Sequence, residues 1–224
     1  MKGPTTAFAK TGGITSAASG ILFLTRGIFE YLAGPPPSTG TDVLQWAARN
    51  EILLAIQNEV TFFAALLLIP AMLILYRILR ADHQIAAATG CGITASIFPV
   101  LVVLVAIQGR LVYPVFGINM NTPSLAEFVV TSYYGGLHAV DVMAAVATLV
   151  LGLSMRRDPN GRLIASLSVI MGIMDMVGSF PWIIGPIADL ICQTFFSLWF
   201  ILLAWVLFAS GHEARVSGQT QSKD

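Results

Sequence analysis

Charged side chains are scarce in this chain of 224 residues. Asp, Glu, Lys and Arg make up 11% of it, against roughly a quarter in a soluble domain, and their charges balance to zero. A chain without excess positive charge lacks the basic surface that binds nucleic acid, so we expect no nucleic-acid partner. The composition excludes an ordinary soluble domain and indicates a protein of the lipid bilayer.

Familiar cofactor and catalytic motifs are also missing. The two cysteines, Cys91 and Cys192, form no Cys-x-x-Cys pair, which argues against a redox or zinc site. No lysine lies within an apolar segment, so a retinal Schiff base is excluded. The serine-hydrolase elbow, the zinc-protease motif, the phosphate loop and the intramembrane aspartyl-protease motif are absent. We therefore predict no cofactor and no metal site.

Long apolar runs are what the chain does have, with 56% hydrophobic residues and a mean hydropathy of +0.78. A run of about 20 such residues can cross the hydrocarbon core of a bilayer as a helix. We predict an all-α, polytopic bundle of six transmembrane helices, with residues 1–210 as a single domain and 211–224 as a polar cytoplasmic tail. The predicted spans are 14–33, 52–77, 85–108, 126–155, 163–184 and 187–209.

The ends of the first span are informative. Lys2 and Lys10 precede it, but no small-residue cleavage pattern follows, so we expect a retained helix rather than a signal peptide. Three prolines, Pro35 to Pro37, prevent the helix from continuing. After them, residues 43–48 could form a short interfacial helix anchored by Trp46.

The basic residues predict the orientation. Two lie in the first, third and fifth connections, Arg49 and Arg110, whereas nine lie in the two tails and the other connections. Positive charge stays on the cytoplasmic side of bacterial inner membranes, so both termini are predicted to be cytoplasmic. The nine are Lys2, Lys10, Arg77, Arg80, Arg156, Arg157, Arg162, Arg215 and Lys223.

Ionisable residues inside the predicted spans fall at a similar depth. Helical rise places most of them about 20–27 Å from the cytoplasmic interface of a core about 30 Å thick. A charge at membrane depth is costly and persists when it is paired, hydrated or used. This layer is the predicted site, and it consists of Arg26, Glu30, Glu59, His138, Asp141, Asp175 and Asp189.

Helical spacing adds neutral polar residues to the layer, because polar stripes turn towards other helices rather than towards lipid. Five carboxylates face one guanidinium and one imidazole, so we expect protonated carboxyls or a bound cation. The candidate ligand-binding residues are Arg26, Glu30, Glu59, Tyr134, His138, Asp141, Asp175, Ser179, Asp189 and Gln193.

Structural roles are open for the same residues. Arg26 with Glu30 is an i, i+4 pair that would serve as a clasp, and His138 with Asp141 would serve as a hydrogen-bonded orienting pair. Glu59 would cap or hydrate the start of its helix. Asp189 would favour the positive end of a helix dipole.

A weak internal similarity accompanies these features: Gly34-Pro35 and Gly185-Pro186 each end a helix, and Thr-Phe-Phe follows on the next helix in both halves. The chain also resembles a family of uncharacterised bacterial six-helix integral membrane proteins. The residues that carry the resemblance are Gly20–Phe23, the proline-rich loop with Trp46, Ala65–Pro70, Leu75–Arg77 and Leu198–Ile201. It implies architecture and transfers no catalytic residue.

Three functions fit this sequence. The first is a pocket in the outer half of the bundle that binds or translocates a small ligand, a cation or a proton. The second is an enzyme that acts on a lipid or isoprenoid, cyclase-like, with Asp175, Glu59 or Asp141 as general acid. The third is a structural or assembly subunit. The bilayer is the expected partner in each case, and the oligomeric state stays open.

Overall fold

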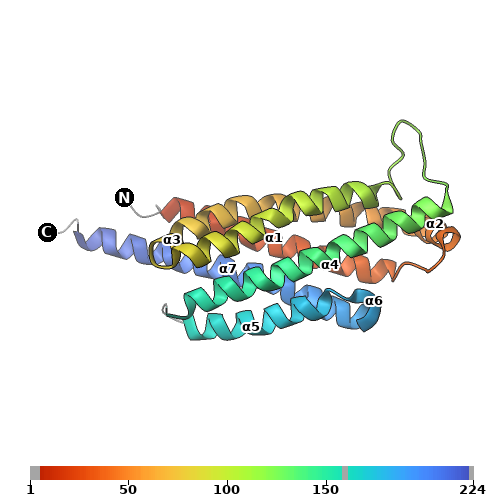
Figure 1. Cartoon of the computed structure of the whole chain (residues 1–224). Helices are drawn as coiled ribbons and strands as arrows, with labels where there is room; N and C mark the ends of the chain where they lie inside the picture. Colours follow the sequence, from red (N-terminus) through yellow and green to blue (C-terminus); the bar gives the residue numbers. More distant parts are fainter. Residues whose placement is uncertain (1–5, 158–160, 222–224) are drawn as a thin grey trace.

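The computed structural model describes residues 6–157 and 161–221, and almost all of them are helical. Within these residues there is no β-strand, only an isolated bridge between Val115 and Ile118. The helices lie side by side along one axis (Figure 1). They are α1 (Thr6–Ala33), α2 (Gly40–Arg49), α3 (Glu51–Gly109), α4 (Pro123–Ser154), α5 (Gly161–Gly178), α6 (Pro181–Ile184) and α7 (Pro186–Gln221), with a 3-10 turn η1 (Met155–Arg157).

Length and apolar composition identify this as a membrane protein. In the described part of the chain, three helices could cross a bilayer: α3, α4 and residues Pro186–Ser210 of α7. Many large apolar side chains on these helices are exposed, among them Phe63, Phe128 and Trp205. Apolar residues on all sides of a helix are typical of helices that pack on one face and meet lipid on the other.

Helix α3 is bent into two arms, residues 51–82 and 84–109, that join at His83. His83 has non-helical dihedral angles (φ −136°, ψ 45°), and the chain turns back there (Figure 1). The two ends of α3 therefore meet: Tyr113, just beyond its end, donates a hydrogen bond to the carbonyl of Ala55 (3.1 Å). The arms correspond to the predicted spans 52–77 and 85–108.

Several predicted boundaries differ from the structure. α1 begins at Thr6, eight residues before the predicted span, and α7 continues to Gln221, so the helix extends into the predicted polar tail. The predicted span 163–184 breaks after Gly178, because Phe180 leaves the helical region (φ −121°, ψ 57°) before Pro181 starts the short α6. Proline lacks the amide hydrogen that would continue α5.

The short helix predicted near residues 43–48 is present as α2, with Thr39 as its N-cap. Trp46 does not serve as an exposed anchor. Its side chain is 8% exposed, and its indole N–H donates to the carbonyl of Ala33 (2.9 Å) at the end of α1. α2 therefore packs against α4 and α3 at one end of the bundle, and Trp46 joins it to the end of α1.

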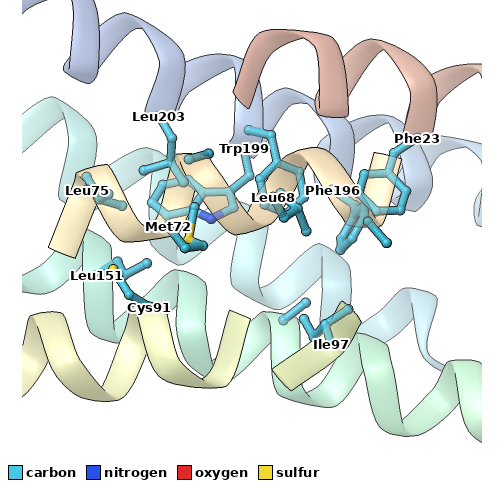
Figure 2. Close-up of a cluster of buried hydrophobic side chains, with 14 of the residues drawn as sticks. Phe23, Leu68, Met72, Leu75, Cys91, Ile97, Leu151, Phe196, Trp199 and Leu203 are labelled. Carbon is cyan, nitrogen blue, oxygen red and sulfur yellow. The ribbon is translucent and has the colours of Figure 1, made fainter. Parts of the chain in front are cut away.

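One continuous apolar core joins the helices. Figure 2 shows Leu68 and Met72 of the first α3 arm beside Trp199 and Leu203 of α7. Helix α1 packs against α7 and α3, and two hydroxyls fix it there. Ser16 donates to the carbonyl of Phe200 (2.7 Å), and Ser19 donates to the carbonyl of Ala64 (2.9 Å). Small polar residues at helix contacts let backbones approach closely in membranes.

Gly20 tests this close packing. A Cβ at Gly20 would lie 2.7 Å from the carbonyl oxygen of Ser197, whereas a Cβ at Gly92 would meet nothing within 4 Å. We expect Gly20→Ala to lower the free energy of unfolding by about 1–3 kcal/mol, as overpacking does. Gly92→Ala should leave it unchanged or raise it by up to about 1 kcal/mol.

Both cysteines are free and buried, so a thiol-reactive dye reports thermal unfolding in detergent. Equal midpoints for the two variants would show that α1 does not depend on this contact.

Candidate functional site

A cavity of about 630 Å³ lies at the end of the bundle that carries α2 and α6. Its wall combines the end of α1, the proline-rich connection, the middle of α4, α6 and the start of α7. The lining residues are Glu30, Tyr31, Gly34–Pro37, Val130, Thr131, Tyr134, Gly135, Pro181, Trp182, Gly185, Pro186 and Asp189.

Two helix breaks create this cavity. Gly34 (φ 71°) ends α1, and Gly185 (φ 80°) separates α6 from α7; each is followed by a proline. Positive φ is the conformation that glycine adopts without steric cost, and proline prevents the helix from continuing. Both Gly-Pro pairs line the cavity, so the pairs noticed in the sequence lie together in space. Trp182 of α6 also lines it.

Arg26 joins α1 to α7 next to the cavity. It is 4% exposed and is the only buried basic residue in the described part of the chain. Its guanidinium donates to the carboxylate of Glu30 (2.8 Å) and to the side-chain oxygen of Gln193 on α7 (2.9 Å). The predicted Arg26–Glu30 pair is therefore present, and it has a third member that ties α1 to α7.

Three carboxylates, Glu30, Asp141 and Asp189, lie within electrostatic reach of this guanidinium, and Asp175 lies within reach of Asp141; we call these four the carboxylate cluster. Asp141 on α4 lies within electrostatic reach of Arg26, Glu30 and Asp189. Asp175 on α5 lies within reach of Asp141 and beside Thr148. Asp189 is in the first turn of α7, as predicted, and lines the cavity. The structure thus brings together four of the five predicted carboxylates.

Unpartnered oxygens mark the cluster. Among the described residues, neither carboxylate oxygen of Asp175 has a hydrogen-bond partner, and Oδ1 of Asp189 has none. Their side chains are only 3% and 9% exposed, respectively. A buried carboxylate without donors is costly in a low-dielectric interior, so it favours a proton or a cation beside it.

His138 does not pair with Asp141 as the sequence suggested. Its Nδ1 lies 2.9 Å from the carbonyl oxygen of Ser179, which directly follows the end of α5. Because a carbonyl only accepts, Nδ1 carries a hydrogen. The imidazole also packs against Phe180 (4.8 Å between ring centres). His138 and Ser179 therefore fix the break between α5 and α6 that shapes the cavity, and they do not line it.

Glu59 lies apart from the cluster. It is on the exposed side of α3 and accepts a hydrogen bond from the Tyr113 hydroxyl (3.0 Å). Burial and the adjacent Glu59 carboxylate raise the pKa of the Tyr113 phenol to about 12. Glu59 therefore secures the connection after α3 rather than the cavity wall.

Buried amides are the polar residues that a search for charges missed. Gln57, Asn58 and Gln108 are buried, and Gln57 donates to the hydroxyl of Tyr133 (3.3 Å). Tyr133 in turn interacts with Arg26. A useful signal was present, since Gln57 and Asn58 directly precede Glu59 within an apolar run. Neutral amides extend the polar layer across to α3.

Comparisons of the chain with protein-family models, curated proteins and solved structures find no match. Function therefore rests on the chemistry of the cavity and of the residues around it. In the described part of the chain, no group of three His, Cys, Asp or Glu residues is arranged to hold a metal ion.

Arg26→Leu should destabilise the bundle strongly. Removing one partner of a buried ion pair costs about 3–5 kcal/mol, because the remaining charge is left uncompensated. Arg49→Leu on the exposed surface of α2 is the matched control, and it should change the unfolding midpoint little. Thermal unfolding in detergent measures both. An Arg26→Leu protein as stable as the control would show that the cluster needs no positive charge.

Proposed function

We propose that the chain is a multi-pass protein of the bacterial inner membrane, with six crossings and both termini in the cytoplasm. The 59 residues of α3 would extend about 90 Å as a straight helix, enough for two crossings of a core about 30 Å thick. α1 begins and α7 ends at the same end of the bundle (Figure 1), which fits an even number of crossings. The excess of basic residues at that end supports a cytoplasmic assignment.

Cysteine labelling tests this topology. In a Cys91→Ser, Cys192→Ser background, Asn119→Cys should react in intact spheroplasts with a maleimide that cannot cross membranes. Gln84→Cys, which is exposed beside the bend of α3, should react only after permeabilisation. The reverse pattern would invert the orientation, and labelling of both from outside would contradict two crossings by α3.

The cavity, in this proposal, binds a small organic molecule that carries a positive charge, for transport or sensing. One observation carries the proposal: two carboxylates, Glu30 and Asp189, stand on the wall of a 630 Å³ cavity. Glu30 is already paired with Arg26, whereas Oδ1 of Asp189 has no hydrogen-bond partner among the described residues. Asp189 is therefore the carboxylate on the cavity wall that is free to bind a positively charged group of a ligand.

The rest of the wall suits an organic cation. Tyr134 and Trp182 supply aromatic surface, and the proline-rich connection supplies apolar surface. Aromatic faces attract ammonium groups by about 0.5–2 kcal/mol each. A volume of 630 Å³ lies in the range of small-molecule sites, about 300–1,000 Å³.

An enzyme that uses a carboxyl group as general acid is the second candidate, because a buried carboxyl faces a largely apolar cavity. In that case Asp189 or Glu30 would be the acid, since Asp175, Asp141 and Glu59 do not line the wall. An isoprenoid carbocation would meet the same aromatic and carboxylate groups that bind an ammonium. A purely structural role of the cluster predicts no binding at all.

Asp189→Asn should weaken the binding of benzyltrimethylammonium by at least about tenfold, which corresponds to 1.4 kcal/mol. The amide keeps the shape of the side chain and removes its charge. Glu59→Gln is the matched control, because it removes a carboxylate outside the cavity wall.

Titration calorimetry on the purified, detergent-solubilised proteins gives both affinities. Equal affinity of Asp189→Asn and wild type, or an equal loss in Glu59→Gln, would contradict a cation site in this cavity.

A further inference from the structure

Behind the cavity wall, aspartates of three helices lie next to one another. Asp189 of α7 lines the cavity, Asp141 of α4 is within electrostatic reach of Asp189, and Asp175 of α5 is within reach of Asp141. The side chains of Asp141 and Asp175 are 9% and 3% exposed, and neither lines the cavity. The series therefore leads from the cavity into the interior of the bundle.

The charges around this series do not balance. α1 contributes Arg26 and Glu30, α4 contributes Asp141, α5 contributes Asp175, and α7 contributes Asp189 with the thiol of Cys192 beside the three aspartates. Tyr133 and Tyr134 of α4 also lie near Arg26 and Glu30. Four ionised carboxylates against one guanidinium would leave three uncompensated negative charges. A buried site of this kind reduces its charge by holding protons or by binding a cation.

Asp175 is the best placed of these residues to hold a proton. Both of its oxygens lack a hydrogen-bond partner among the described residues. Its charged neighbour is Asp141, which is also acidic, and the hydroxyl of Thr148 lies close enough to interact with its carboxyl group. Glu30, by contrast, is held by Arg26 in a direct ion pair (2.8 Å). Because Glu30 already has Arg26 as its partner, the three aspartates are the groups of the cluster that can exchange protons.

We propose that the cavity exchanges its cationic ligand for a proton drawn from the Asp189–Asp141–Asp175 series. This inference rests on the proposed cation site. When the cation enters beside Asp189, the O–H bond of the Asp175 carboxyl group breaks, and the proton passes by way of Asp141 and Asp189 and leaves through the cavity to the adjacent solution. One positive charge replaces another, so the net charge of the cluster is unchanged. Protonation reverses the step and expels the cation.

Proton counting on the purified protein tests the exchange. Titration of benzyltrimethylammonium in two buffers of different ionisation enthalpy gives the number of protons released per bound cation. Wild type and Glu59→Gln should release close to one. Asp175→Asn should still bind the cation, because Asp175 is not on the wall, but it should release less than half as much.

The outcomes separate this inference from the cation site. If wild type binds the cation and releases no proton, or if Asp175→Asn releases as many protons as wild type, the exchange series is wrong while the cation site stands. If wild type binds no benzyltrimethylammonium, the proposed cation site itself is wrong, and the exchange is overturned with it.

A second measurement needs no variant. If protons and cation compete, the affinity of wild type should rise with pH over part of the range from about pH 5 to 9, by up to about tenfold per unit. Folding at each pH is checked with the thiol-reactive dye. A flat affinity profile over that range overturns the exchange.

Discussion

The buried guanidinium of Arg26 is the constraint on which the rest of the polar region depends. A charge in this position needs hydrogen-bond acceptors and opposite charge, because the surrounding helices supply neither water nor lipid headgroups. Glu30 satisfies it within α1, and Gln193 satisfies it from α7. The same helix is seated by the hydroxyls of Ser16 and Ser19. One stripe of α1 therefore sets the positions of both α7 and α3, and the carboxylate cluster assembles around its charged end.

The cavity exists because helices stop where a membrane bundle would otherwise be closed by side chains. Gly34 and Gly185, each followed by a proline, end two neighbouring helical segments at the same level. His138 holds the third interruption, between α5 and α6, through the carbonyl of Ser179. Backbone groups freed by such breaks need partners, and both Gly-Pro breaks lie on the cavity wall. Asp189 then faces that cavity from the first turn of α7.

The carboxylates of the cluster fall into two groups: Glu30, which is paired with Arg26, and the three aspartates, which are not. Arg26 forms a direct ion pair with Glu30, so the negative charge of that carboxylate is balanced within the protein. Asp189, Asp141 and Asp175 share no basic side chain of their own in the described part of the chain. Their charge must be compensated by something that can leave, either a proton or a ligand. In the proposed function, this division assigns structural stability and ligand binding to different residues of one layer.

Local patterns in the sequence predicted several features that a single helix decides, although the predicted span 163–184 breaks after Gly178. The i, i+4 pair of Arg26 and Glu30, the first-turn position of Asp189 and the short helix α2 are all present. Predictions that needed a second helix were less reliable. His138 pairs with the carbonyl of Ser179, just after α5, instead of Asp141, and Glu59 accepts a hydrogen bond from Tyr113 on the exposed side of α3. Gln57, Asn58 and Gln108 went unnoticed, because an uncharged amide stands out only when its burial is known.

The sequence by itself determined that the chain is a helical membrane protein with an acid-rich polar layer. Hydrophobic length and the position of charges along a helix are one-dimensional properties, and chain order records them directly. Only the tertiary structure decided which members of that layer meet. The rotation of each helix about its axis and the site at which helices break depend on packing against neighbours. Three carboxylates therefore gather at Arg26, with Asp175 beside Asp141, and two of the four line a cavity, whereas Glu59 is not on its wall.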